Sequence, residues 1–191
     1  MPTKRSYLLL LLFLSGAGTL VLEVAWFRRM AQIAGATAIA MGAVLAAVIG
    51  GMAVGALLFG RRADRSPHPL RLYGLLEAGI ALAAIVTPWL LDASRVAFDG
   101  LLARFSDHPA LLSATQFLLA TLLLAGPALL MGGSLPAIAC ALRGERDRRG
   151  RDLGWLYASN TLGAVVGTFA AGFFLLPTLG LSGATRSAAV L

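Results

Sequence analysis

Charged residues are scarce in this chain. Only 13% of its 191 residues are Asp, Glu, Lys or Arg, whereas soluble domains contain about 25%. Hydrophobic residues make up 58%, and they gather in blocks about as long as the roughly 20 residues that a helix needs to cross a bilayer. This pattern argues against a soluble domain and predicts an all-α membrane protein, a polytopic helical bundle in contact with the lipid bilayer.

Cysteine and histidine are almost missing. The chain has one cysteine, Cys140, and two histidines, His68 and His108, which lie beside prolines in expected loops. An internal disulfide, a thiolate metal site and a histidine metal cluster are therefore not expected. The sequence also lacks a glycine-rich turn between a strand and a helix, which nucleotide and S-adenosyl cofactors require. We expect no cofactor, no metal and no catalytic residue within residues 1–191.

Five apolar blocks predict five membrane spans. The first block begins like a secretory signal and reaches the small residues SGAG, but it continues through TLVLEVAWF, which favours an uncleaved span. A sixth apolar segment is too short to cross the bilayer, so it is either interfacial or the start of a span in a longer protein. The expected spans are about 7–27, 34–59, 70–91, 110–142 and 153–176, with the partial sixth from 181.

The net charge of +7 follows the expected topology. With the N-terminus in the cytoplasm, eleven of the sixteen Lys and Arg residues fall inside and five outside, as the positive-inside rule favours. Because the basic residues lie in short loops between apolar blocks, the charge does not indicate a nucleic-acid partner. Between the third and fourth spans, the apolar residues of DASRVAFDGLLARFSDHP fit either a short helix on the membrane surface or a solvated loop.

Small residues recur at helical spacing in two of the spans. Gly51 and Gly55 form one small-xxx-small pair, and Gly163 and Gly167 form another. In lipid such pairs allow helix backbones to approach closely, so we expect tight helix packing at these positions. A substrate path lined by small residues is the alternative.

The fourth span carries residues that interrupt helices, namely Pro127, Gly132, Gly133 and Pro136. Proline removes a helix hydrogen bond and clashes with the preceding turn, so we expect the helix to kink or break near 132–136. Broken helices mark substrate sites in many transporters, but a kink that only shapes the bundle explains the same residues. The sequence leaves both interpretations open.

Two carboxylates lie inside the apolar blocks. A charge at mid-bilayer costs about 2.5 to 3.5 kcal/mol, so Glu23 needs a partner or a proton. A salt bridge to Arg28 or Arg29 and a proton or cation site are the two interpretations. Glu77 lies deeper than an anchoring residue needs to be, and Arg71 or an arginine of the preceding loop could reach toward it. A functional and a structural role are both open for Glu77.

Further polar residues share these spans. Gly74 and Ala81 lie on the helix face of Glu77 at helical spacing. Gln116 and Asn160 are candidates for the same intramembrane polar site, although either could simply form a hydrogen bond between helices.

The loop after the second span contains a recognisable motif. In GALLFGRRADRSPHPLRLYG, Gly60, Asp64 and Arg65 match the G-x-x-x-D-R core of the loop motif of major facilitator transporters, with SPHPLR in place of its basic continuation. This resemblance implies a cytoplasmic latch whose acid and base contact neighbouring helix ends. It also implies a bundle resembling the N-terminal half of a major facilitator fold.

Five blocks in order resemble a narrower family. LVLEVAWFRR, GALLFGRRADR, PLRLYGLLEAGIAL, MGGSLP and LYASNTLGAVVGTFAAGFFLLPTLGL are similar to the membrane region of bacterial fused major facilitator/spermidine synthase proteins. The resemblance implies a multi-pass inner-membrane protein, with further transmembrane helices and a synthase-type domain beyond Leu191. The expected function is to embed that domain and to pass a small cation such as a polyamine. The alternatives are an anchor for a polyamine-synthesising enzyme and a structural module that recruits membrane partners.

Overall fold

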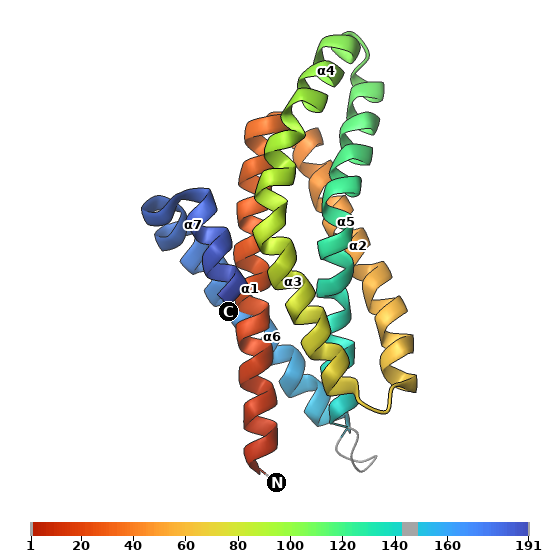
Figure 1. Cartoon of the computed structure of the whole chain (residues 1–191), viewed down its shortest axis with the longest axis vertical. Coiled ribbons are helices and arrows are strands. Elements are labelled where there is room, and N and C mark those ends of the chain that lie inside the picture. Colours follow the sequence, from red (N-terminus) through yellow and green to blue (C-terminus); the bar gives the residue numbers. More distant parts are fainter. Residues whose placement is uncertain (1, 143–148, 191) are drawn as a thin grey trace.

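The computed structural model describes residues 2–142 and 149–190, and within these ranges it is a helical bundle without strands (Figure 1). Five helices are long and apolar enough to span a membrane, which confirms the all-α polytopic class. The elements are α1 (Pro2–Ala34), α2 (Ala38–Arg65), α3 (Pro69–Ala93), α4 (Arg95–Phe105), α5 (Pro109–Ala141), α6 (Arg149–Ala170), a π-helical turn η2 (Ala171–Leu175) and α7 (Leu176–Val190).

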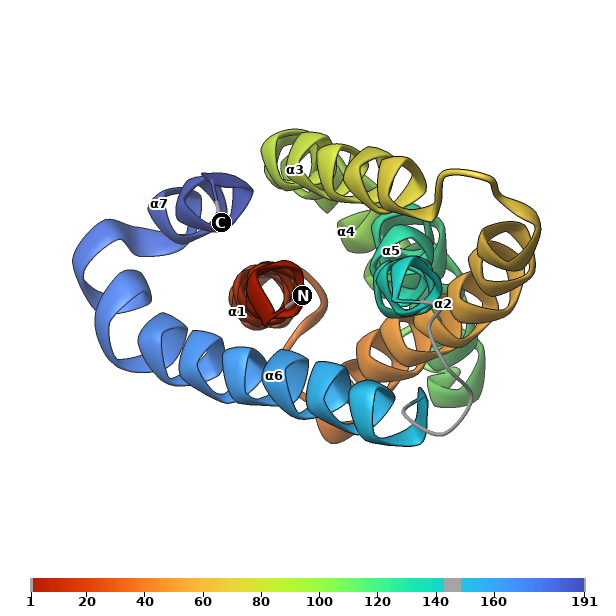
Figure 2. The same cartoon turned by 90° about the horizontal axis from the view of Figure 1, so that it is seen from below.

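The first helix lies in the middle of the bundle (Figure 2). It packs along α6 on one side and contacts α3 and α7 on the other, while α2 and α5 form the second tightly packed pair. Trp26 is the largest fully buried side chain among the described residues, and it joins Met30 and Leu124 in the main apolar cluster. The spanning stretch of α1 is accordingly the most buried of the five candidate spans.

Two glycines bring α2 and α5 into backbone contact. A Cβ atom added to Gly55 would collide with the carbonyl oxygen of Leu129, and one added to Gly132 would collide with that of Met52. The contact is reciprocal, because Leu129 precedes Gly132 by three residues and Met52 precedes Gly55 by three residues. Such close approach is typical of small-residue packing between membrane helices.

The crossing of α1 and α6 repeats this reciprocal contact. A Cβ atom on Gly163 would collide with the carbonyl of Phe13, and one on Gly16 with that of Asn160, again three residues before the partner glycine. Two helix pairs with no segment in common are thus joined by the same local geometry. Both crossings leave no room for any side chain larger than hydrogen at these four glycines.

The expected break near residues 132–136 is absent. Helix α5 is continuous from Pro109 to Ala141, with Pro127 and Pro136 inside it. Membrane helices tolerate proline where neighbouring helices support the freed backbone. Here Gly132 and Gly133 lie against α2, where a Cβ on Gly133 would lie 2.7 Å from the side chain of Phe59. These glycines therefore serve close packing along a continuous helix.

The C-terminal segment turns back onto the bundle. Gly180 has φ 66° and ψ −176°, a combination that is accessible almost exclusively to glycine. Beyond this turn, Ala184, Thr185 and Ala188 are buried, and α7 contacts α1 and α3 (Figure 2). The short sixth segment thus packs against α1 and α3 at the edge of the bundle.

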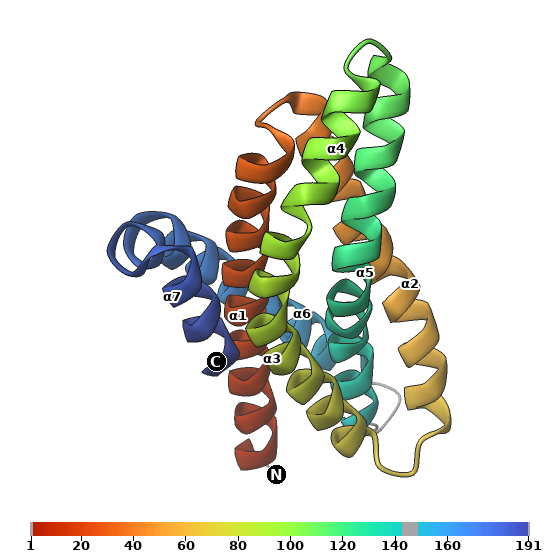
Figure 3. The ribbon, with the colours of Figure 1, turned by 45° about the horizontal axis from the view of Figure 1, so that its top comes forward.

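The connection between α3 and α5 is helical. Helix α4 continues from the end of α3 toward the turn into α5 (Figure 3). Phe98 is buried in the main apolar cluster, whereas Val96 and Leu102 are exposed. Of the two interpretations of this segment, the structure supports a short helix.

Candidate functional site

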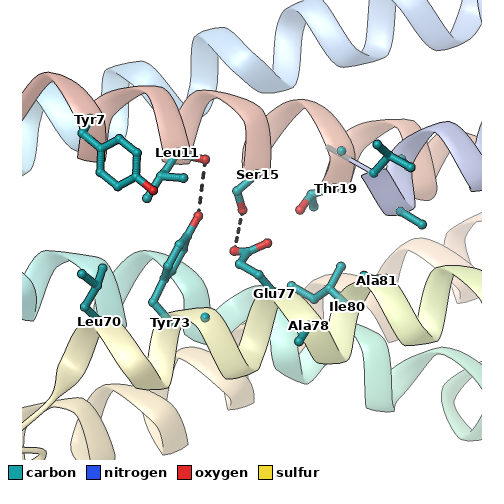
Figure 4. Close-up of a pocket in the computed structure, with 15 residues that line it drawn as sticks. Tyr7, Leu11, Ser15, Thr19, Leu70, Tyr73, Glu77, Ala78, Ile80 and Ala81 are labelled. Atoms are coloured by element: carbon teal, nitrogen blue, oxygen red, sulfur yellow. Dashed lines mark hydrogen bonds between the residues drawn. The ribbon is translucent and has the colours of Figure 1, made fainter.

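A cavity of about 480 Å³ opens between α1, α3 and the end of α7 (Figure 4). The residues of α1 and of α3 that line this cavity recur mostly at spacings of three or four positions. One face of each helix therefore lines the cavity. Its size falls within the range of about 300 to 1,000 Å³ that is usual for small-molecule pockets. The polar side chains on its wall are Tyr7, Ser15, Thr19, Tyr73 and Glu77.

Two hydrogen bonds join the helices across this cavity. The hydroxyl of Ser15 donates to Oε1 of Glu77 at 2.8 Å. One turn earlier on α3, the hydroxyl of Tyr73 donates to the carbonyl oxygen of Leu11 at 3.3 Å. Figure 4 shows the carboxylate of Glu77 directed toward α1, with Tyr7 and Tyr73 on one side and Thr19 on the other. The carboxylate is thus fixed at one oxygen by a neutral donor.

No ion pair neutralises Glu77 among the described residues. Glu77 lies eight residues after Pro69, which is about 12 Å along the helix at 1.5 Å per residue. Arg71, which could have reached toward it, instead lines a groove at the α2–α3 turn. A carboxylate at membrane depth without a basic partner requires a proton or a cation.

Glu23 lies in a different environment. It is partly buried on α1, eleven residues after Leu12 and seven before Met30, both of which are buried, so it shares an inward face. The described residues provide it with no hydrogen bond or ion pair, and it does not line the Glu77 cavity. The structure does not bring the two carboxylates into one site.

The arginines after Glu23 have other roles. Arg29 pairs with Asp92 at the end of α3, where Arg95 also lies 3.7 Å from the same carboxylate oxygen. Arg28 is exposed. The salt bridge between Glu23 and these arginines, one of the two sequence interpretations, is therefore not formed, because the arginine side chain reaches across to α3.

The Arg29–Asp92 pair is expected to contribute little to stability. Both side chains are partly exposed, and such pairs are worth about 0.2 to 1 kcal/mol. We expect Arg29→Gln and Asp92→Asn to show a coupling energy in this range in a double-mutant cycle, measured by unfolding in mixed micelles and weakened by salt. Arg28→Gln, combined with Asp92→Asn, is the control and should show no coupling. A coupling well above this range would contradict the assignment.

Gln116 and Asn160 have separate structural positions. The side-chain amide of buried Gln116 donates to the carbonyl of Ala34 at 3.3 Å, which satisfies one of the carbonyls left free at the end of α1. Asn160 lies at the glycine crossing of α1 and α6, next to Gly16. Neither residue lines the Glu77 cavity. The four candidates for one intramembrane polar site therefore lie at separate places in the bundle. They are Glu23, Glu77, Gln116 and Asn160.

The loop-motif residues lie at the end of α2. Asp64 accepts a hydrogen bond from the thiol of Cys140, near the end of α5, at 3.5 Å. Gly60 faces Pro136, with an added Cβ lying 3.7 Å from the proline ring. Arg65 lines the groove at the α2–α3 turn. The acid of the motif thus contacts the end of α5, while its base lines the groove toward α3.

Sequence reasoning missed the partners of Glu77. Ser15 and Tyr73 each occur within an apolar run where a single hydroxyl is unremarkable. The signal that was available is the spacing of Tyr73 and Glu77, four residues apart on one helix face, in line with Gly74 and Ala81. The contribution of α1 was not accessible from spacing, because it depends on which helices are neighbours.

Comparisons of the chain with known protein families, with curated proteins and with solved structures found no match.

Proposed function

We propose that this chain is an integral membrane module that binds and passes a small organic cation, with Glu77 as the cation-binding carboxylate. The observation that carries the proposal is the position of Glu77. Its carboxylate faces the open cavity between α1, α3 and the end of α7, accepts a hydrogen bond from Ser15, and has no basic partner among the described residues.

The cavity favours an amine over a metal ion. Hard metal ions take six or more oxygen ligands, whereas this wall offers one carboxylate, a few hydroxyls and largely apolar surface. No group of three or more His, Cys, Asp or Glu residues that could hold a metal ion occurs among the described residues. An ammonium group can pair with Glu77 while its alkyl chain contacts the apolar wall, and Tyr7 and Tyr73 can add cation–π attraction. An alkyl di- or polyamine has both features.

The cellular setting of the module is part of the proposal. The eleven-to-five distribution of basic residues supports a cytoplasmic N-terminus. The sequence resemblance to fused major facilitator/spermidine synthase proteins supports the bacterial inner membrane and a synthase-type domain as a partner in the same or another chain. In this setting the module would move a polyamine made or consumed by that domain.

Flux of labelled spermidine into proteoliposomes tests the proposal. We expect Glu77→Gln to reduce the flux at least tenfold, since removing the charge leaves the ammonium group unpaired at membrane depth. Glu23→Gln is the matched control, because it removes the same charge from a residue outside the cavity, and it should retain the flux.

The alternatives predict different results. A robust flux that survives both substitutions would show that neither carboxylate is the site. An absence of flux in the wild-type protein, with full aminopropyltransferase activity of the partner domain alone, would support the membrane anchor. Stable membrane partners without flux would support a structural module.

A further inference from the structure

A second groove lies at the turn between α2 and α3. Its volume is about 600 Å³, and it is lined by five basic side chains and three leucines. The basic residues come from the end of α2, the turn and the start of α3. They are Arg61, Arg62, Arg65, His68 and Arg71.

Among the residues that the structure describes, no salt bridge compensates the positive charge of this groove. The nearby acid, Asp64, is directed instead toward Cys140 on α5. Helix α3 also begins here, and its N-cap residue His68 makes no side-chain capping bond, so the positive end of the helix dipole adds to the arginines. The groove is therefore suited to a multiply charged anion.

The leucines that line the groove indicate which class of molecule carries that anion. Leu58 and Leu75 are exposed, and together with Leu72 they continue the groove from the arginines onto the apolar sides of α2 and α3. A soluble anion would make no favourable contact with this apolar surface, whereas the acyl chains of a lipid would. Arginine is well suited to phosphate because its guanidinium presents several donors in a planar fork.

We infer that this groove binds the phosphate of an anionic phospholipid, with its acyl chains lying along the leucines of α2 and α3. The site lies at the same end of the bundle as the N-terminus (Figure 1), and it is lined by none of the residues of the Glu77 cavity. It is thus independent of the proposed cation function. Basic pockets beside cytoplasmic helix ends commonly bind such headgroups.

The test compares lipid binding by two charge-matched variants of the full chain. Arg61→Gln/Arg71→Gln removes one arginine from each helix of the groove, and Arg28→Gln/Arg104→Gln removes two exposed arginines outside it. Binding of phosphatidylglycerol is titrated by native mass spectrometry after exchange into a neutral detergent. At about fivefold per arginine, we expect the groove variant to bind about 25-fold more weakly and the control variant to bind like the wild type.

Three results would overturn the inference. One is equal binding by the groove variant and the wild type, and another is equal weakening in both variants, which would indicate general charge attraction. The third is complete displacement of the lipid by inorganic phosphate at constant ionic strength, which would indicate a free-phosphate site. Circular dichroism checks that the double variant is folded. If it is not, the single variants Arg61→Gln and Arg71→Gln are each expected to bind the lipid about fivefold more weakly than the wild type.

Discussion

Replacing Gly163 by alanine is expected to destabilise the bundle by about 1 to 3 kcal/mol or more, the range for overpacking an interior. The added methyl group would collide with the carbonyl oxygen of Phe13. A backbone atom cannot rotate away as a side chain can, so α6 must move off α1. The separation would also loosen the wall of the Glu77 cavity, since α1 contributes Ser15 to it. SDS-induced unfolding in mixed micelles, followed by circular dichroism, measures the loss.

A control on the same helix isolates the effect of the crossing. Gly154 has open space where its Cβ would lie, so Gly154→Ala should leave the stability unchanged or raise it by up to about 1 kcal/mol through helix propensity. The second crossing offers the same comparison, with Gly132→Ala against Gly126→Ala on α5, because Gly126 also faces open space. If Gly163→Ala and Gly132→Ala unfold at the same SDS fraction as their controls, the backbone contacts are not essential.

The second large effect concerns ligand binding at Glu77. A ligand that binds only the folded state at one hundred times its Kd stabilises the protein by about 2.7 kcal/mol. We therefore expect spermidine to raise the melting temperature of the detergent-solubilised wild type in a concentration-dependent way. Glu77→Gln should lose this shift entirely, because the carboxylate supplies the charge that pairs with the ammonium group. Without ligand, the variant should be at least as stable as the wild type, since it buries no unpaired charge.

Neighbouring variants make this prediction specific. Ser15→Ala removes the hydroxyl that holds Oε1 of Glu77 and should weaken the spermidine shift without abolishing it. Glu23→Gln should keep the full shift. A Glu77→Gln protein that is still stabilised by spermidine as strongly as the wild type would show that the amine binds elsewhere.

The sequence predicted the helices more reliably than it predicted which helices pack against one another. The length of each apolar block can be compared with bilayer thickness without knowing its neighbours, so the five spans could be recognised one at a time. The break expected near Gly132 is absent because α2 lies directly against α5 there, and this packing offsets the intrinsic cost of proline and glycine in a helix. The partner of Arg29 was also out of reach, since Asp92 lies 63 residues away on another helix.

The sequence alone determined that the chain is apolar enough to cross a membrane as helices, that Glu77 shares a face with Gly74 and Ala81, and that basic residues concentrate at the expected cytoplasmic end. These properties are local, because they follow from composition and from the helical repeat. Only the tertiary structure decided that α1 pairs with α6, that Ser15 holds Glu77, and that Glu23 stays apart. Pairing depends on complementary surfaces of distant segments, and no spacing within one segment encodes it.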